Sequence, residues 1–248
     1  MQQSNGSIAA AGPAESADSD WLAGWYARIS GTAAYDVAVK AAYLLWLLFL
    51  ARQILSPFLV YLRQADTLPP AQFISSVVAR GTVFAFIATL AVFTMLRSRP
   101  VAKAPGLAPR LAASMGTFLA MLFPLFPHRD LSVAMNIASA LVTVTGNCLA
   151  IYVVCWLGRS LSTMAEARRL VTAGPYRYVR NPLYLAEEVA VIGTFIQYAS
   201  LWTALLMAAH WLLQLVRMRN EERILRDTFP GEYAAYAGAT ARLVPGVY

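Results

Sequence analysis

The stretch Leu183–Val216, LYLAEEVAVIGTFIQYASLWTALLMAAHWLLQLV, decides how this chain folds. It is about 34 residues long and almost wholly apolar, whereas one helix needs about 20 residues to cross a bilayer. Backbone polar groups cannot stay unpaired in hydrocarbon, so the stretch must be helical. We therefore expect a helical hairpin that turns near residues 198–201, with two arms so short that the hairpin need not cross fully.

The rest of the chain has the same apolar character. Of its 248 residues, 58% are hydrophobic and only 13% are charged, whereas charged residues make up about a quarter of a soluble domain. This composition excludes an ordinary soluble protein. Further apolar runs predict crossings at residues 37–62, 73–96, 111–127 and 131–157. The expected fold class is all-α, a polytopic transmembrane helix bundle of four crossings plus the C-terminal hairpin.

The positive charges predict the orientation of this bundle. The net charge is +7, and the cations concentrate in the 97–110 loop, the 158–182 loop and the segment after residue 216. The positive-inside rule places these three segments and both termini in the cytoplasm. Cations between apolar runs fit topology and anionic headgroups, so we expect the lipid bilayer and no nucleic acid as a partner. The sequence leaves the oligomeric state open.

The cysteine and histidine residues predict neither a disulfide nor a metal site. Cys148 and Cys155 lie seven positions apart in one apolar run. On a helix this is a rise of about 10 Å, which is too far for a disulfide. No Cys/His spacing typical of a metal site appears.

Two acids inside the hairpin raise the question of function. Glu187 and Glu188 follow the cytoplasmic loop by about five residues, so they lie in the inner leaflet. Carboxylates cannot reach far toward water, and acids inside a membrane need a partner or a wet cavity. They are therefore candidates for catalysis, and the alternative is a structural pair with an arginine of the loop.

Other polar residues in apolar runs have simpler interpretations. Arg52 and Arg80 lie near the predicted outer leaflet, where their side chains extend to headgroups or line a lipid cavity. Four others are expected to form interhelical hydrogen bonds, although the histidine among them could line a cavity: Asn136, Asn147, Gln197 and His210.

Two polar segments flank the hairpin and must meet at the cytoplasmic surface. The segment VTAGPYRYVRNPLY (171–184) precedes the hairpin, and RNEERIL (219–225) with FPGEYAAYAGATARLVP (229–245) follows it. These motifs, in this order, resemble the C-terminal signature of the isoprenylcysteine carboxyl methyltransferase and phospholipid methyltransferase superfamily. The resemblance covers about residues 150–248. Asn181 departs from the histidine usual in the prenylcysteine enzymes, and Pro230 precedes the glycine of the last motif.

The resemblance implies S-adenosylmethionine as the methyl donor and assigns residues to it. Residues of the first segment would line the donor pocket, and Glu221 with Glu222 would close it. Arg180 is suited to grip the donor's carboxylate, and Glu187, Glu188 and Arg180 are the catalytic candidates. The lining residues expected from the first segment are Gly174, Tyr176, Arg180, Asn181, Pro182 and Tyr184.

The sequence also predicts three regions of the chain and a lipid acceptor. Residues 1–35 are expected to be a disordered tail with an interfacial helix near Trp21–Ile29, or the frayed start of the first span. Residues 36–130 would hold the N-terminal transmembrane helices, and 131–248 the methyltransferase core. The favoured acceptor is an isoprenylcysteine-type carboxylate, and the alternative is a phospholipid amine.

Two other classes of protein are alternatives to a methyltransferase. An NADPH-dependent isoprenoid or sterol reductase shares a related helical core, and a membrane scaffold or carrier would give Tyr, Arg and Glu no reason to converge. The composition, rich in Ala and Arg and poor in Lys, favours a multi-pass protein of the bacterial inner membrane. A eukaryotic source would place it in the endoplasmic reticulum.

Overall fold

The computed structural model describes residues 28–29, 32–63, 65–98, 100–103, 115–116, 119–162 and 166–246. It divides into two units, Met1–Val39 and Lys40–Tyr248. The tail and most of the predicted interfacial helix therefore lie outside the described residues, although Arg28 and Ile29 are helical. Everything that bears on function below lies in the second unit.

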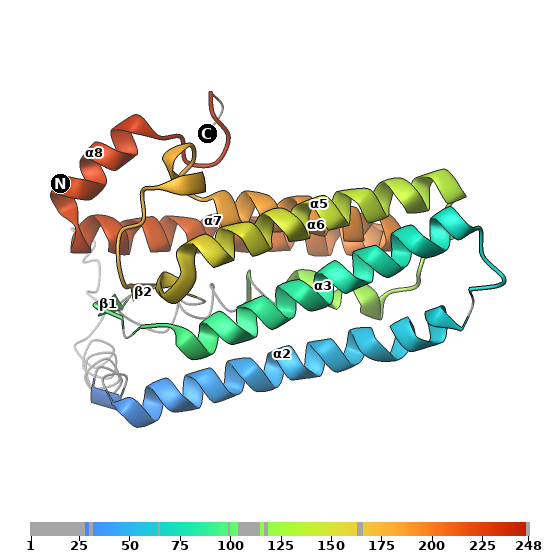
Figure 1. Ribbon diagram of the computed structural model, residues 1–248. Helices are drawn as coiled ribbons and strands as arrows, with labels where there is room; N and C mark the ends of the chain where they lie inside the picture. The colour runs from blue at the N-terminus through green and yellow to red at the C-terminus, as the bar shows by residue number, and fades with distance from the viewer. Residues whose placement is uncertain are drawn as a thin grey trace, which may run out of the picture. The chain divides into compact units, whose positions relative to one another are not determined.

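Helices make up nearly all of the described structure (Figure 1), which confirms the predicted all-α class. The strands β1 and β2 are two residues each and form one antiparallel pair. The elements are α2 (Ala33–Leu62), α3 (Pro70–Leu96), β1 (Ala102–Lys103), η1 (Ala120–Leu125), α5 (Val133–Leu157), η2 (Gly158–Ser160), β2 (Glu166–Ala167), η3 (Gly174–Arg177), α6 (Pro182–Tyr198), α7 (Leu201–Thr228) and α8 (Pro230–Ala239).

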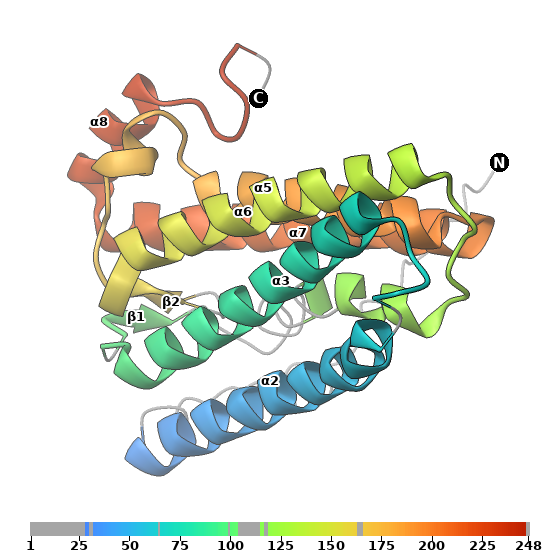
Figure 2. The same cartoon turned by 45° about the vertical axis from the view of Figure 1, so that its right-hand side comes forward.

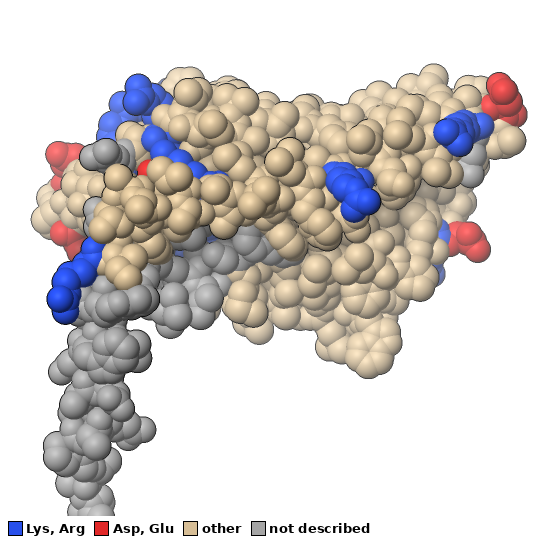
Figure 3. Space-filling view, turned by 90° about the horizontal axis from the view of Figure 1, so that it is seen from below, with Lys and Arg blue, Asp and Glu red and all other residues tan. Residues whose placement is uncertain are grey.

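Four helices of the described chain are long and apolar enough to cross a membrane: Ala33–Leu62, Pro70–Leu96, Val133–Ser160 and Leu201–Thr228. Many of their large apolar side chains are exposed, Leu48, Leu141 and Leu212 among them. On the face seen in Figure 3, charged side chains lie mainly toward the two ends, and uncharged surface covers most of the length between them. Exposed apolar surface of this kind is what lipid requires.

The predicted crossing at 111–127 is wrong at its C-terminal end. Ala120–Leu125 form the 3₁₀ helix η1, which contains Pro124 and ends where Phe126 N–H bonds to the Phe123 carbonyl. Proline has no N–H donor and its ring clashes with the preceding turn, which kinks or ends an α-helix; α2, by contrast, continues through Pro57. Residues 111–114 and 117–118 of this run lie outside the described part of the chain.

The hairpin forms where it was expected. Helix α6 ends at Tyr198 and α7 begins at Leu201. Ser200 caps α7 by accepting from Thr203 N–H, and Thr203 Oγ1 accepts in return from Ser200 N–H, which is a reciprocal capping arrangement. Helix α6 has 17 residues, but α7 has 28. The expectation of two short arms is therefore wrong for α7, which continues through the charged motif that follows Val216.

Helices α5 and α6 pack with their backbones in close approach. A Cβ on Gly146 would lie 2.2 Å from the Ala190 nitrogen, and one on Gly193 would lie 2.4 Å from Thr143 Oγ1. Ser139 Oγ also donates to the Gly193 carbonyl at 2.8 Å. Small residues and a hydroxyl bond across the contact are typical of membrane helix pairs. This packing fixes α6, which carries Glu187 and Glu188.

The Arg-rich segments meet at one end of the second unit, here called the Arg-rich end. Ser98 N–H bonds to the Arg159 carbonyl at 3.0 Å, and Arg180 N–H bonds to the Ala241 carbonyl at 2.8 Å. Figures 1 and 2 both show α8 and the β1–β2 pair at this end. At the opposite end, Arg129 N–H bonds to the Gln197 carbonyl at 2.8 Å. The loops are thus sorted between the two ends as the charge pattern predicts.

The side of the membrane on which each end lies is a testable prediction. With Cys148 and Cys155 first replaced by alanine, a cysteine at Val101 should react with a membrane-impermeant maleimide only from the cytoplasmic side. A cysteine at Ala65 should react only from outside. Both positions are exposed in the structure, whereas Ala167 is buried and unsuitable. Reversed labelling would contradict the orientation drawn from the positive-inside rule.

Candidate functional site

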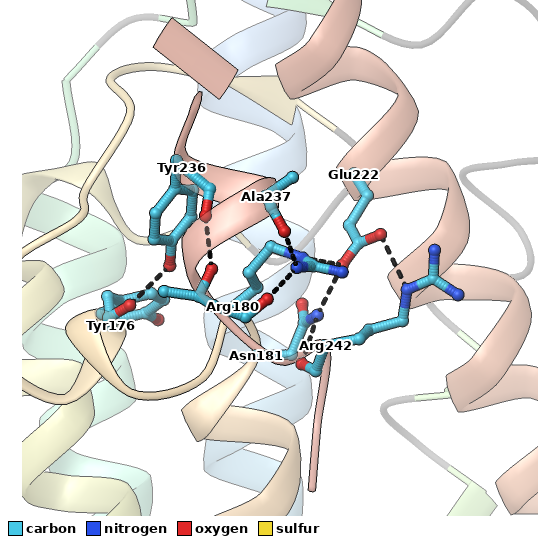
Figure 4. A network of polar contacts seen from close by, with 8 residues as sticks. Tyr176, Arg180, Asn181, Glu222, Tyr236, Ala237 and Arg242 are labelled. Carbon is cyan, nitrogen blue, oxygen red and sulfur yellow. Dashed lines mark hydrogen bonds and ion pairs between the residues drawn. The ribbon is translucent and has the colours of Figure 1, made fainter. Parts of the chain in front are cut away.

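Glu222 of α7 is bonded by two arginines and an asparagine at the Arg-rich end (Figure 4). Its Oε1 accepts from Arg180 Nε at 3.2 Å and from Asn181 Nδ2 at 2.9 Å, and its Oε2 accepts from Arg242 Nε at 2.9 Å. The Glu222 side chain is 5% exposed. These four residues are called the Glu222 network. It joins the loop before α6, the C-terminal half of α7 and the segment after α8.

Most of the side-chain donors of Arg180 and Asn181 are already used within the chain. Arg180 Nη1 donates to the carbonyls of Ala237 (2.9 Å) and Thr240, and Asn181 Nδ2 also donates to the Arg242 carbonyl at 3.1 Å. Asn181 is the N-cap residue of α6 but makes no side-chain cap bond. Asparagine is a preferred capping residue, so its amide serves the network in place of the helix. Pro182 begins α6 as expected, where its missing N–H costs nothing.

Tyrosines hold α8 against the loop before α6. Tyr236 Oη donates to the Tyr176 carbonyl at 2.7 Å, and Val179 forms a parallel bridge with Ala241. Burial raises the pKa of the Tyr176 and Tyr236 hydroxyls above its ordinary value, and raises the pKa of Tyr233 to about 12. These hydroxyls therefore remain protonated donors at neutral pH.

Gly174 makes a turn that only glycine fits. Its φ is +61°, and a Cβ there would lie 2.1 Å from the indole ring of Trp156 at the end of α5. Beside this contact, Cys155, Trp156 and residues 169–173 line an open pocket of about 570 Å³. The first glycine of the loop motif thus sets the path of the chain between this pocket and η3.

Gly174→Ala should destabilise the protein by about 2–5 kcal/mol, because a positive φ and an overpacked indole both oppose the methyl group. Gly238→Ala is the matched control, since a Cβ at Gly238 in α8 meets nothing within 4 Å. That change should be neutral or stabilise α8 by up to about 1 kcal/mol. Thermal unfolding in detergent measures both, and equal effects would contradict the structural reading of Gly174.

A second cluster of charges lies deeper in the bundle, around the buried Arg217 of α7. Arg217 Nε donates to Glu221 Oε1 at 3.1 Å, and the guanidinium carbon lies 5.0 Å from the centre of the Tyr184 ring. Glu187 accepts a long bond of 3.5 Å from Gln214 Nε2 and interacts electrostatically with Arg217. These five residues form the Arg217 cluster.

Tyr43 of α2 covers the Arg217 cluster. Its side chain is buried and interacts electrostatically with Arg217 and Glu187. The cluster therefore holds two carboxyl groups, those of Glu187 and Glu221, beside one guanidinium group.

Glu188 points to a different set of partners from Glu187. Its Oε1 lies 2.9 Å from His210 Nε2, and its Oε2 accepts from Trp211 Nε1 at 2.6 Å. His210 is 2% exposed, and its Nδ1 is buried without a hydrogen-bond partner among the described residues. Trp211 is exposed on the apolar surface. His210 and Glu222 are twelve positions apart on α7, which is a rise of about 18 Å.

The structure thus gathers the ten site residues predicted from the sequence into three places. Arg180, Asn181 and Glu222 meet in the Glu222 network, with Gly174, Tyr176 and Pro182 shaping the loop. Tyr184, Glu187 and Glu221 meet in the Arg217 cluster, whereas Glu188 lies apart with His210. Sequence reasoning missed four further residues of these clusters: Tyr43, Gln214, Arg217 and Arg242.

The residues at the Arg-rich end have the chemistry that S-adenosylmethionine needs. Glu221 and Glu222 are consecutive residues, and their carboxylates suit an ammonium or ribose hydroxyls. Guanidinium groups beside them suit a carboxylate, and buried tyrosines offer ring faces for adenine or a sulfonium. Tyr233 Oη is buried near Glu222 without a hydrogen-bond partner among the described residues. An orphaned donor of this kind fits a site made for a polar ligand.

The polar loop before α6 and the Glu-Glu motif of α7 therefore meet at the Arg-rich end, at the base of the hairpin. Residues 134–232 match the family model for phospholipid methyltransferase. This match agrees with the superfamily whose signature the motifs of the sequence resemble.

Two curated proteins are similar over part of their length. The cobalt-zinc-cadmium resistance protein CzcN of Cupriavidus metallidurans is 39% identical over 77 residues, which is 31% of this chain and 35% of that protein. The nickel-cobalt-cadmium resistance protein NccN of Alcaligenes xylosoxydans xylosoxydans is 33% identical over 81 residues, or 32% and 38%. The chain thus spans little more than a third of the curated relatives it matches. No group of three or more His, Cys, Asp or Glu side chains suited to a metal ion occurs among its described residues.

Proposed function

We propose that this protein transfers a methyl group from S-adenosylmethionine to a lipid-borne acceptor that reaches the Arg217 cluster from the bilayer. One observation carries the proposal. The neighbouring residues Glu221 and Glu222 belong to two different clusters, one joined to the polar loop and the other to Glu187 inside the bundle. A water-soluble donor and an apolar acceptor need such a meeting point.

The donor-binding residues in this proposal are Glu221, Glu222 and Arg242, with Tyr176 and Tyr233 beside them. When bound, S-adenosylmethionine would supply a methyl group on a sulfonium, which is a good electrophile. Arg180 and Asn181 hold Glu222 in place and tie the loop to α7, so they position the site more than they contact the donor. Tyr43 and Tyr184 keep water from the inner side of the Arg217 cluster, where exclusion of water strengthens each charge.

The two carboxyl groups of the cluster favour an amine acceptor. An amine must lose its proton before it attacks, and Glu187 is the carboxylate of the Arg217 cluster that is not assigned to the donor. The neighbouring Glu188–His210 pair offers a second group able to take up a proton. The match to a phospholipid methyltransferase model supports the same choice. We therefore propose a phospholipid-type amine headgroup as the acceptor.

An isoprenylcysteine-type carboxylate is the second candidate, and Arg217 favours it. A buried guanidinium is the group that would hold an acceptor carboxylate. Glu187 and Glu221 compete for this cation, however, and would repel a third carboxylate. The acceptor would have to displace Glu221 from Arg217.

Parallel calorimetric titrations test the proposal. Purified protein should bind S-adenosylhomocysteine and not NADPH, and Glu221→Gln should weaken that binding by about tenfold or more, as expected for a lost charged hydrogen bond. Glu232→Gln is the control, because Glu232 is exposed on α8. Binding of NADPH alone would assign the chain to the reductase class and overturn the proposal.

The acceptor needs a separate assay with labelled S-adenosylmethionine. Vesicles of phosphatidylethanolamine should take up the methyl label, and a farnesylcysteine analogue in phosphatidylcholine vesicles should not. The reverse result would assign the carboxylate acceptor.

A further inference from the structure

A polar pocket lies at the end of the bundle opposite the Glu222 network. Its volume is about 190 Å³, and its lining includes Arg80, His128, Arg129, Asp130, Asn136 and Gln197. This is far more than the roughly 10–15 Å³ that a single water needs. It is called the Arg80 pocket below, and no residue of the proposed methyltransferase site belongs to it.

Arg80 is held in this pocket by neutral groups. Its guanidinium carbon lies 4.3 Å from the centre of the Tyr61 ring, and Nη1 approaches the Ser76 carbonyl at 3.4 Å. Among the described residues it forms no ion pair with a carboxylate. A cation fixed over a ring keeps its charge and most of its N–H donors available for a ligand.

Two other segments that line the pocket contact each other. Arg129 N–H bonds to the Gln197 carbonyl, and the His128 ring packs edge-on against Tyr198 with their centres 5.4 Å apart. Gln197 is itself fixed, because its Nε2 donates to Ser139 Oγ at 2.8 Å. With Arg80 and Arg129 against Asp130, the lining carries a net positive charge. A pocket with a net positive charge favours an anion.

Arg52 provides a comparison for Arg80. It is exposed on α2 and does not line the pocket. Arg80 is half-buried, stacked on Tyr61 and lines the pocket together with Arg129 from another segment. The sequence gives the same interpretation for both arginines, but their surroundings in the structure differ.

We propose that the Arg80 pocket binds a phosphate group, with Arg80 and Arg129 as the charged donors and His128 as a further donor. Guanidinium groups match phosphate oxygens with paired hydrogen bonds. The phosphate comes either from a lipid headgroup at the membrane surface or from free phosphate in solution. The proposal does not depend on the methyltransferase function.

Two titrations of the full chain in detergent separate these sources. In one, the probe is inorganic phosphate. In the other, the probe is phosphatidylglycerol in mixed micelles, with diacylglycerol as the lipid that lacks phosphate. We expect binding of phosphatidylglycerol and not of diacylglycerol. Binding of inorganic phosphate in addition would identify free phosphate as a ligand too.

Arg80→Gln should weaken this binding by about tenfold or more, whereas Arg52→Gln should change it less than twofold. Arg129→Gln, at an exposed position, serves as the second variant if Arg80→Gln lowers the melting temperature. The proposal is overturned if neither phosphate-bearing probe binds, if diacylglycerol binds equally well, or if Arg52→Gln weakens binding as much as Arg80→Gln and Arg129→Gln do.

Discussion

Replacing Glu187 with Gln is expected to lower turnover by about 10²–10⁴-fold, the usual contribution of a general base. The affinity for S-adenosylhomocysteine should stay within about threefold, because Glu187 lies on α6 and not among the groups assigned to the donor. The change removes a charge from the Arg217 cluster with little change in volume, and Gln214 keeps a polar partner. Single-turnover measurements with a labelled methyl group separate the two effects.

The pH dependence identifies the acceptor in the same experiment. With an amine acceptor, wild-type turnover should rise with pH as the amine loses its proton, and Glu187→Gln should remove most of that activity. With a carboxylate acceptor no base is needed, so turnover should be nearly flat above about pH 6. Glu188→Gln is the companion variant, since Glu188 is held by His210 and Trp211. Unchanged turnover in Glu187→Gln would remove the base from this proposal.

Glu222→Ala should be the most destabilising single change at the Arg-rich end. It leaves Arg180 and Arg242 without their carboxylate and Asn181 without its main acceptor. Removing one partner of a buried ion pair costs about 3–5 kcal/mol. Thermal unfolding in detergent should show this loss, and hydrogen exchange should show that α8 and the loop before α6 lose protection together.

Two variants control for charge and for shape. Glu232→Ala removes an exposed carboxylate from α8 and should change stability by less than about 1 kcal/mol. Glu222→Gln keeps the shape and one acceptor oxygen, so it should cost less than alanine. If Glu222→Ala unfolds at the wild-type temperature, the network does not hold the two segments together.

The apolar pattern predicts the helices well because helix length depends on residues that are neighbours in the sequence. The bilayer sets the length of each helix, and a run too long for one crossing must turn near its middle, as it does at Ala199–Ser200. The crossing expected to reach residue 127 fails for a local reason. Hydropathy counts Pro124 as a tolerable residue of an apolar run, whereas its missing donor and its ring end the helix there.

The site is predictable only in part, because burial depends on partners far apart in sequence. The hairpin alone brings Arg180 and Asn181 to Glu222, so this contact follows from the motifs. Arg217 and Glu221 have the i,i+4 spacing of an ion pair on a solvated helix face. Nothing nearby in the sequence indicates that Tyr43 of α2 covers the pair and makes it internal. The separation of Glu187 from Glu188 likewise follows from the packing of α6.

The contact between Gly146 and Ala190 also limits how a lipid enters. No acyl chain passes between α5 and α6, because even one methyl group at Gly146 would collide with the neighbouring backbone. On its other side, α6 is joined to α7 by side-chain bonds, among them those of Glu188 with His210 and with Trp211, whose indole is exposed. If the acceptor is a lipid as proposed, it would have to approach Glu187 from the α6–α7 side, past the indole of Trp211.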